Sequence, residues 1–226
     1  MDEMHSQMTA RNSQAHVAAT MPRPQASGET IELMGAVMPF ARNAEIYGEN
    51  EPAEYLYKVV SGAVRTYRVL NDGRRQIGAF YLPGDVFGIE VGDQHTFSAE
   101  SIVDSKIMLI KRTSLVSLSS RSADVARQLW TMAATELQRT QDHTMLLIKT
   151  AQERVAGFLL EMAKRAPRAN AVELPMSRQD IADYLGLTIE TVSRTLTQLE
   201  NSAAIEVPTS RRIVLRNQAA LSRLNG

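Results

Sequence analysis

Three polar side chains near the C-terminus, Glu190, Ser193 and Arg194, are spaced so that one face of a helix would carry all of them. Their hydrogen-bonding chemistry suits base edges in the DNA major groove. Arg donates two bonds to O6 and N7 of guanine, Glu accepts from the N4 amine of cytosine, and Ser bonds either way. A solvated helix face carries the same residue types, so the elements that position these side chains decide whether they can read bases.

The segment 174–200 predicts two short helices joined by a tight turn. Ser177 opens a Ser-x-x-acid helix start that closes with Asp180, Gly186 ends the first helix, and Thr188 caps the second. Apolar or small residues at helical spacing supply the buried faces: Ile181, Ala182, Leu185, Leu187, Val192, Leu196 and Leu199. This order is that of a helix-turn-helix. The alternative is an αα-hairpin inside a protein core, which the polar outer face of the second helix disfavours.

Two short β-like runs, 204–207 and 212–215, follow the second helix around a Pro-Thr-Ser-Arg-Arg turn and predict a wing. Polar side chains around these elements can bond phosphate oxygens, which sets the register on DNA without reading its sequence. The candidates for such backbone contacts are Ser177, Arg178, Thr188, Thr191, Arg211 and Arg212. For the two wing arginines, a role in solubility is the alternative.

Residues 122–149 contain no Gly or Pro and predict a helix of about 40 Å, too long to pack fully against a small β-domain. A stripe at alternating spacings of four and three residues runs from Ala126 to Ala151 and suits a two-stranded coiled coil between identical chains. We therefore predict a homodimer with a seam of Trp130, Ala133, Leu137, Thr140, Thr144 and Leu147. Packing within one chain is the alternative, because the middle of the stripe is polar. Thr150 to Glu153 form a capping box that begins a new helix.

Five runs rich in Val, Tyr, Ile and Phe predict strands: 55–60, 63–70, 76–82, 96–103 and 105–111. The Asn71-Asp72-Gly73 loop between two of them suits a hairpin. About eight strands are expected in all, enough for a small antiparallel roll. Before them, Thr30 to Ala36 fit one helical turn that Pro39 ends.

These elements predict an α+β chain with an N-terminal antiparallel β-roll, a long dimerisation helix and a C-terminal winged helix-turn-helix. The expected divisions are a flexible leader at 1–28, a β-roll sensor-like domain at 29–121, the dimerisation helix at 122–149 and the DNA-binding domain at 150–226.

Composition narrows the possible functions. The 226 residues include no cysteine, which excludes disulfides, thiol nucleophiles and thiolate-bound metals. Only His95 of the four histidines falls in the roll, so a metal-binding jelly-roll enzyme is disfavoured and no metal or cofactor is expected. Lys and Arg balance Asp and Glu at 25 each, so no diffuse basic field draws the chain to nucleic acid. Without a long apolar run or a signal-peptide core, we expect a cytoplasmic protein that does not cross a membrane.

The motifs TAQERVAGFL and SRQDIADYLGLTIETVSRTL, placed after a roll and a long helix, resemble the CRP/FNR superfamily of bacterial transcription regulators. The Glu190-Thr-Val-Ser193-Arg194 segment is similar to the Glu-x-x-Ser-Arg signature of the FNR branch and looks most like FixK-type and FnrN-type activators. The resemblance implies a cyclic-nucleotide-binding-like jelly roll. It also implies a palindrome of TTGAT-like half-sites about one helical turn apart, read by Glu190, Ser193 and Arg194. Recruitment of RNA polymerase at genes for low-oxygen respiration or nitrogen fixation is implied as well.

Three features depart from the family patterns. The lack of cysteine removes the iron–sulfur oxygen sensor of FNR itself. Cyclic-nucleotide binders carry Arg-Ser/Thr-Ala where this chain has Phe97-Ser98-Ala99, and an aromatic ring cannot replace the pairing of a guanidinium with phosphate. Ser177 stands where FixK relatives often carry a cysteine, so a redox input through that thiol is absent here. We expect an activator without a small-molecule effector; the alternative is a cyclic-nucleotide-responsive regulator with Glu90 and Ser98 in its pocket.

Overall fold

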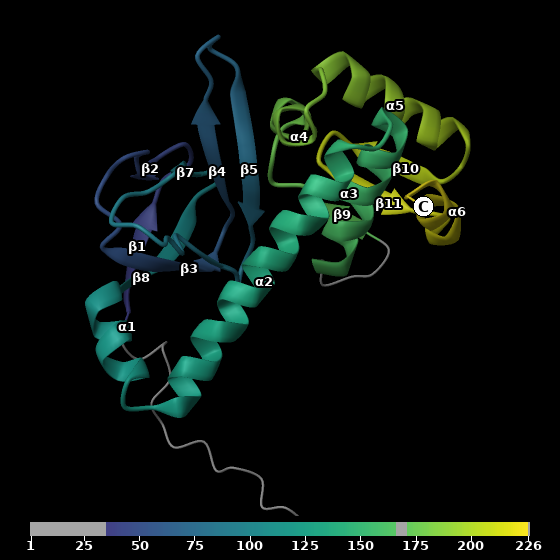
Figure 1. The fold of residues 1–226 in the computed structure, drawn as a ribbon. Coiled ribbons are helices and arrows are strands. Elements are labelled where there is room, and N and C mark those ends of the chain that lie inside the picture. The colour runs from purple at the N-terminus through teal and green to yellow at the C-terminus, as the bar shows by residue number, and fades with distance from the viewer. Residues whose placement is uncertain (1–34, 166–170, 226) are drawn as a thin grey trace, which may run out of the picture.

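A computed structural model describes residues 35–165 and 171–225, so the leader predicted at 1–28 lies outside the described residues. Two four-stranded antiparallel sheets form the predicted roll, in the orders β1-β8-β3-β6 and β2-β7-β4-β5 (Figure 1). The strands of the roll are β1 (Ala36–Phe40), β2 (Glu45–Tyr47), β3 (Tyr55–Ser61), β4 (Val64–Val69), β5 (Arg75–Tyr81), β6 (Val86–Phe87), β7 (Ser98–Ser101) and β8 (Ser105–Lys111). No helix in the described part of the chain has the length and apolar character that crossing a membrane requires.

A shared apolar core holds the two sheets of the roll together. Val59, Phe87 and Ile107 reach it from one sheet, and Val64 and Ala99 reach it from the other. All five are almost fully buried. Burying a large apolar side chain contributes about 1.5–3 kcal/mol, so this core is the main reason that the strands close into a roll.

The start of the roll corrects one sequence expectation. Pro39 does not end a helical turn, because residues from Ala36 onward form β1, which pairs with β8. β1 lies at the edge of its sheet, where a proline without an N–H costs no ladder hydrogen bond. The rest of the proposed turn, up to residue 34, lies outside the described residues.

A long helix, α2 (Ala123–Leu147), runs beside the roll from α1 (Arg112–Ser119) to the C-terminal part of the chain (Figure 1). Ser122 caps it, with Oγ accepting a hydrogen bond from the N–H of Val125 at 3.5 Å. Its 25 residues correspond to about 37 Å. Val125 and Leu146 are buried against the same chain, so one side of α2 is used internally.

The C-terminal part is a winged helix-turn-helix, as predicted. Its elements are α3 (Ala151–Arg165), β9 (Ala171–Glu173), α4 (Arg178–Leu185), α5 (Ile189–Asn201), β10 (Ile205–Thr209), β11 (Arg212–Leu215) and α6 (Gln218–Asn225). α3 begins at the predicted capping box, in which the N–H of Thr150 donates to the Glu153 carboxylate at 2.7 Å. The wing is a sheet of three strands, because β9 joins the two predicted ones in the order β10-β11-β9.

The roll and the C-terminal part share one apolar core. Phe80 of β5 lies 6.3 Å from Phe158 of α3 and 5.1 Å from Tyr184 of α4, measured between ring centroids. Ile77 of β5 belongs to the same buried cluster. Aromatic contacts of this kind contribute about 0.5–1.5 kcal/mol beyond their buried area, so the two parts are packed rather than loosely tethered.

Candidate nucleic-acid interface

Helix α4 begins at a capping box and ends at a left-handed glycine. Ser177 Oγ accepts a hydrogen bond from the N–H of Asp180 at 3.0 Å, and the Asp180 carboxylate accepts one from the N–H of Ser177 at 2.9 Å. Gly186 adopts φ 62° and ψ 41°. This conformation costs a residue with a Cβ about 1–2 kcal/mol, so glycine ends α4 without strain. The sharp turn that follows is what brings α5 across α4.

Helix α5 packs one face inward. Thr188 Oγ1 accepts a hydrogen bond from the N–H of Thr191 at 3.3 Å and begins the helix where the sequence predicted. Val192, Leu196 and Leu199 are buried, which confirms the predicted apolar face. The opposite face of α5 therefore points away from the core.

The three candidate base-reading residues lie together on that outer face. Glu190 and Arg194 are exposed and Ser193 is half-buried. Hydrogen bonds from its own backbone N–H and from the Thr188 side chain lower the pKa of Glu190, so its carboxylate is ionised and acts only as an acceptor. The face therefore offers one acceptor, one hydroxyl and one guanidinium, which are the groups that base edges require.

Two of the candidate backbone contacts support this face directly. Arg178 Nη1 lies 3.3 Å from Ser193 Oγ, and Arg194 Nη2 lies 3.4 Å from Thr191 Oγ1. We call the set Arg178, Thr188, Glu190, Thr191, Ser193 and Arg194 the reading surface. Ser177 is exposed next to it at the start of α4.

The wing arginines lie elsewhere. Both are exposed at the β10–β11 turn, and Arg211 Nη1 donates to the carbonyl of Pro175 at 3.2 Å. Arg212 Nε lies 3.6 Å from the Glu173 carboxylate. Both side chains also line a groove between the wing and the turns of the roll at Gly62 and Pro83. Among the described residues, no hydrogen bond or ion pair joins these two side chains to the reading surface.

Most of the predicted seam lies on the exposed side of α2, whereas Thr140 and Leu147 also line the cavity between α2 and the roll. Trp130 and Leu137 are 75% and 60% exposed, although both are large apolar residues. Ala133, Thr140 and Thr144 are exposed and Leu147 is half-buried. The hydroxyls of Thr140 and Thr144 donate to the carbonyls four residues before them at 3.0 and 2.9 Å. Because these donors are satisfied within the helix, the middle of the seam is less polar than its sequence indicates.

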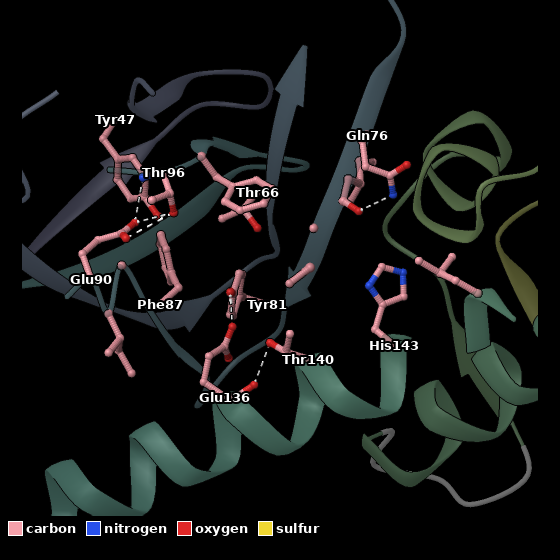
Figure 2. A pocket seen from close by; sticks show the side chains of 17 residues that line it. Tyr47, Thr66, Gln76, Tyr81, Phe87, Glu90, Thr96, Glu136, Thr140 and His143 are labelled. Atoms are coloured by element: carbon pink, nitrogen blue, oxygen red, sulfur yellow. Dashed lines mark hydrogen bonds between the residues drawn. The ribbon is translucent and has the colours of Figure 1, made fainter. Parts of the chain in front are cut away.

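A cavity of about 400 Å³ lies between the roll and α2 (Figure 2). Tyr47 and Phe87 line it from the strands, and α2 contributes Glu136, Thr140 and His143. Its polar groups bond to each other: Tyr81 Oη donates to Glu136 at 2.6 Å, and the N–H of Thr96 donates to Glu90 at 3.0 Å (Figure 2).

The chemistry of this cavity is unsuited to a phosphate. Among the described residues that line it there is no Arg or Lys, whereas Glu90 and Glu136 are carboxylates. Phe97 also lines it, but Ser98 does not, and Ser98 Oγ accepts a hydrogen bond from the N–H of Glu49 at 2.9 Å. A bound phosphate would face like charge without a cation to pair with.

Several contacts that fix α4 have no signal in the local sequence. His143 Nε2 lies 2.8 Å from the carbonyl of Tyr184, and the two rings stack at 3.9 Å. Arg65 and Arg75 of the roll form ion pairs with Asp180 at 2.8 and 2.6 Å. These partners are between 41 and 115 residues apart, so spacing along the chain cannot predict them.

Comparison with known proteins decides the family. Residues 153–224 match the Crp-like helix-turn-helix domain, and residues 37–122 match the cyclic nucleotide-binding domain. Over 203 residues the chain is 50% identical to the nitrogen fixation regulation protein FixK of Azorhizobium caulinodans, an alignment covering 87% of this chain and 82% of that protein. The chain belongs to the CRP/FNR family of transcription regulators, in its FixK-like branch. FixK of Rhizobium meliloti is 40% identical over 189 residues, covering 83% of this CRP/FNR regulator and 86% of that protein.

Solved structures agree with this assignment. The structure of FixK2 from Bradyrhizobium japonicum matches this FixK-like chain with a TM-score of 0.82 and 53% identity, over 85% of this chain and 98% of that one. A CooA mutant from Carboxydothermus hydrogenoformans has a TM-score of 0.72 at 20% identity, over 87% and 89% of the two chains, and so shares the fold alone. The predicted fold class and family are confirmed, and the family's members are DNA-binding transcription regulators.

Proposed function

We propose that this FixK-like regulator is a cytoplasmic homodimeric activator that reads a palindrome of TTGAT-like half-sites and recruits RNA polymerase. Glu190, Ser193 and Arg194 contact base edges in the major groove. Phosphate contacts come from Ser177, Arg178, Thr188, Thr191, Arg211 and Arg212. Residues 150–226 bind DNA, 122–149 form the dimer and 29–121 serve as a scaffold.

The observation that carries this proposal is the outer face of α5. Its capped helix is anchored by a buried apolar face, and the side chains of Glu190, Ser193 and Arg194 share the opposite face. A guanidinium, a hydroxyl and an ionised carboxylate at fixed positions support sequence-specific reading, because non-specific binding needs only cations.

The exposed seam of α2 supports the homodimer. Trp130 and Leu137 leave apolar surface in water along one stripe, and an identical helix packed on that stripe would bury it. A palindrome presents the same half-site twice, which a two-fold symmetric dimer matches.

The roll cavity supports activity without a cyclic nucleotide, because the described lining offers carboxylates and aromatic rings but no cation. The amount of protein then sets its activity. Relatives named for regulation of nitrogen fixation support target genes in nitrogen fixation or low-oxygen respiration. Activation requires RNA polymerase, and we assign that contact to exposed loops.

The decisive test is binding to a TTGAT-N4-ATCAA duplex and to a scrambled duplex at one stated salt concentration, with and without cyclic AMP. We expect selective binding to the palindrome that cyclic AMP leaves unchanged. Equal binding to both duplexes contradicts the reading function, and a large increase with cyclic AMP favours the cyclic-nucleotide alternative. Transcription from a promoter carrying the palindrome, with purified RNA polymerase, tests recruitment separately.

A further inference from the structure

Four charged side chains form a junction between the roll and the first helix of the helix-turn-helix. Arg65 Nη1 of β4 and Arg75 Nη2 of β5 lie 2.8 and 2.6 Å from the same oxygen of Asp180. Arg75 also pairs with Asp183 at 2.9 Å through Nη2 and at 3.0 Å through Nε. We call Arg65, Arg75, Asp180 and Asp183 the junction. Figure 1 shows α4 beside β5, where the junction lies.

The junction is largely shielded from water. The side chains of Asp180 and Arg65 are 4% and 10% exposed, and those of Asp183 and Arg75 are 13% and 26% exposed. Ion pairs that are shielded from water tolerate much less movement than surface pairs. A buried arginine or carboxylate that moves away from its partner is left with neither an ion pair nor hydration. Arg65 Nη2 is held in turn by Glu100 of β7 at 2.8 Å, so the roll fixes its direction.

Asp180 links the junction to the DNA-facing helices. One carboxylate oxygen receives the two arginines, and the other accepts hydrogen bonds from the N–H and Oγ of Ser177 at 2.9 and 2.8 Å. The carboxylate that completes the capping box of α4 is therefore also the carboxylate that the roll holds. Because α5 follows α4 through a tight turn at Gly186, fixing the start of α4 also fixes the direction of α5.

The covalent chain supplies the other attachment. α3 follows α2 after three residues, and α2 carries the seam. A rigid unit attached at one place can rotate about it, whereas a unit attached at two separated places keeps one orientation. The junction is such a second attachment: it adds directional ion pairs to the apolar contacts of Phe80 with Phe158 and Tyr184, and it holds the start of α4 to β4 and β5.

We propose that Arg65 and Arg75 are positioning residues for DNA recognition, which set the distance between the two reading surfaces of the dimer through Asp180 and Asp183. This inference rests on the proposed function. A palindrome fixes the separation of its half-sites, so the orientation of α5 relative to the seam decides which spacing is bound. The junction thereby determines spacing selectivity, although none of its residues belongs to the reading surface.

The test uses the full-length protein and three duplexes, in which the TTGAT and ATCAA half-sites are separated by three, four or five base pairs. Arg75→Gln removes the less buried arginine and leaves Arg65 on Asp180. Asp183→Asn and the double variant that combines Arg75→Gln with Asp183→Asn complete a double-mutant cycle. Arg74→Gln is the matched control, because Arg74 is the preceding residue, pairs with Asp72 in the same hairpin and is 77% exposed. Circular dichroism and binding to random DNA check each variant for folding and for phosphate contacts.

We expect wild type and Arg74→Gln to share one strong spacing preference. Arg75→Gln lowers the ratio of affinities between the best and the adjacent spacing by about tenfold, with random-DNA affinity changed less than about twofold. The double variant matches Arg75→Gln, because the Arg75–Asp183 pair is already lost in the single variant and cannot be lost twice. A folded Arg75→Gln with the wild-type ratio overturns the inference and leaves the proposed function intact. An equal loss of the affinity ratio in Arg74→Gln also overturns the inference and leaves the proposed function intact. Wild type that ignores the palindrome at every spacing overturns both.

Discussion

Arg178 Nη1 lies 3.3 Å from Ser193 Oγ, so the first residue of α4 supports the outer face of α5. The macrodipole disfavours a cation at a helix N-terminus, and Arg178 therefore does not stabilise α4 through its charge. The contact instead holds a guanidinium at the border of the reading surface, where a phosphate would pass beside the base edges.

Arg178→Ala is expected to weaken binding to palindromic and random DNA by similar factors and to reduce the slope of log K against log salt by about one. Stability in urea should change by no more than about 0.5 kcal/mol. The measurement is a salt titration of affinity, with Arg223→Ala on α6 as a control that leaves the slope unchanged. A loss confined to one base position would show that Arg178 reads sequence.

Gly186→Ala is expected to lower the free energy of unfolding by about 1 kcal/mol, because φ of 62° is unfavourable for a residue with a Cβ. Space is not the cause, since an added Cβ would meet its nearest neighbour, Arg154 Nη1, at 3.5 Å. Gly186→Asn should cost less, and Gly92→Ala, where nothing lies within 4 Å, should be close to neutral. Urea unfolding checks the order of the three variants, and equal stability of the two Gly186 variants with wild type would contradict it.

Leu137→Glu is expected to separate the dimer, because it places a charge from each chain at the centre of the seam. The exposed residue Thr131 lies outside the seam, so Thr131→Glu is the matched control and should remain dimeric. Sedimentation at micromolar concentration gives the mass of the assembly. In the Leu137→Glu variant the affinity for the palindrome should fall by at least about tenfold, together with the mass. A dimeric Leu137→Glu variant means that α2 does not form the interface.

The pH dependence of stability should include a contribution from His95. This side chain is 1% exposed and stacks on Tyr47 at 3.6 Å, and neither ring nitrogen has a hydrogen-bond partner among the described residues. Burial lowers the pKa of His95, and the nearby carboxylate of Glu90 only partly opposes this. The unfolded chain therefore takes up a proton more readily than the folded protein, and stability is lost as the pH falls below about 6.5.

Urea unfolding at pH 7.5 and pH 5.5 measures this loss. His95→Gln should show a smaller decrease between the two pH values than wild type, because its side chain does not titrate. The pKa of His143 is also lowered by burial, so part of the decrease should remain in His95→Gln. An identical decrease in both proteins would exclude His95 as a source of the pH dependence.

Sequence signals that involve only a few neighbouring residues predict the ends of the C-terminal helices correctly. Ser177, Gly186 and Thr188 marked the ends of α4 and α5 because caps act through neighbouring backbone groups. The sequence does not predict helix α1, because its Ser-rich and Val-containing segment has low helix propensity. Packing of Leu115 against Leu56 and Val125 stabilises it instead.

The junction illustrates what spacing cannot predict. The sequence places Asp180 in the Ser-x-x-acid start of α4, and its carboxylate completes the capping box there, but its second role depends on two arginines more than a hundred residues away. The charges of Arg65 and Arg75 are visible in the sequence, whereas their common partner depends on how the roll packs against α4. Tertiary contacts of this kind emerge only from the folded chain.

Base reading by α5 is tested most directly with Arg194→Ala on the TTGAT-N4-ATCAA duplex and on duplexes with the guanine replaced. Arg194→Ala should cost about 1–3 kcal/mol of binding free energy on the original duplex and abolish the preference for guanine at that position. An equal loss on random DNA, with the guanine preference retained, would contradict the account.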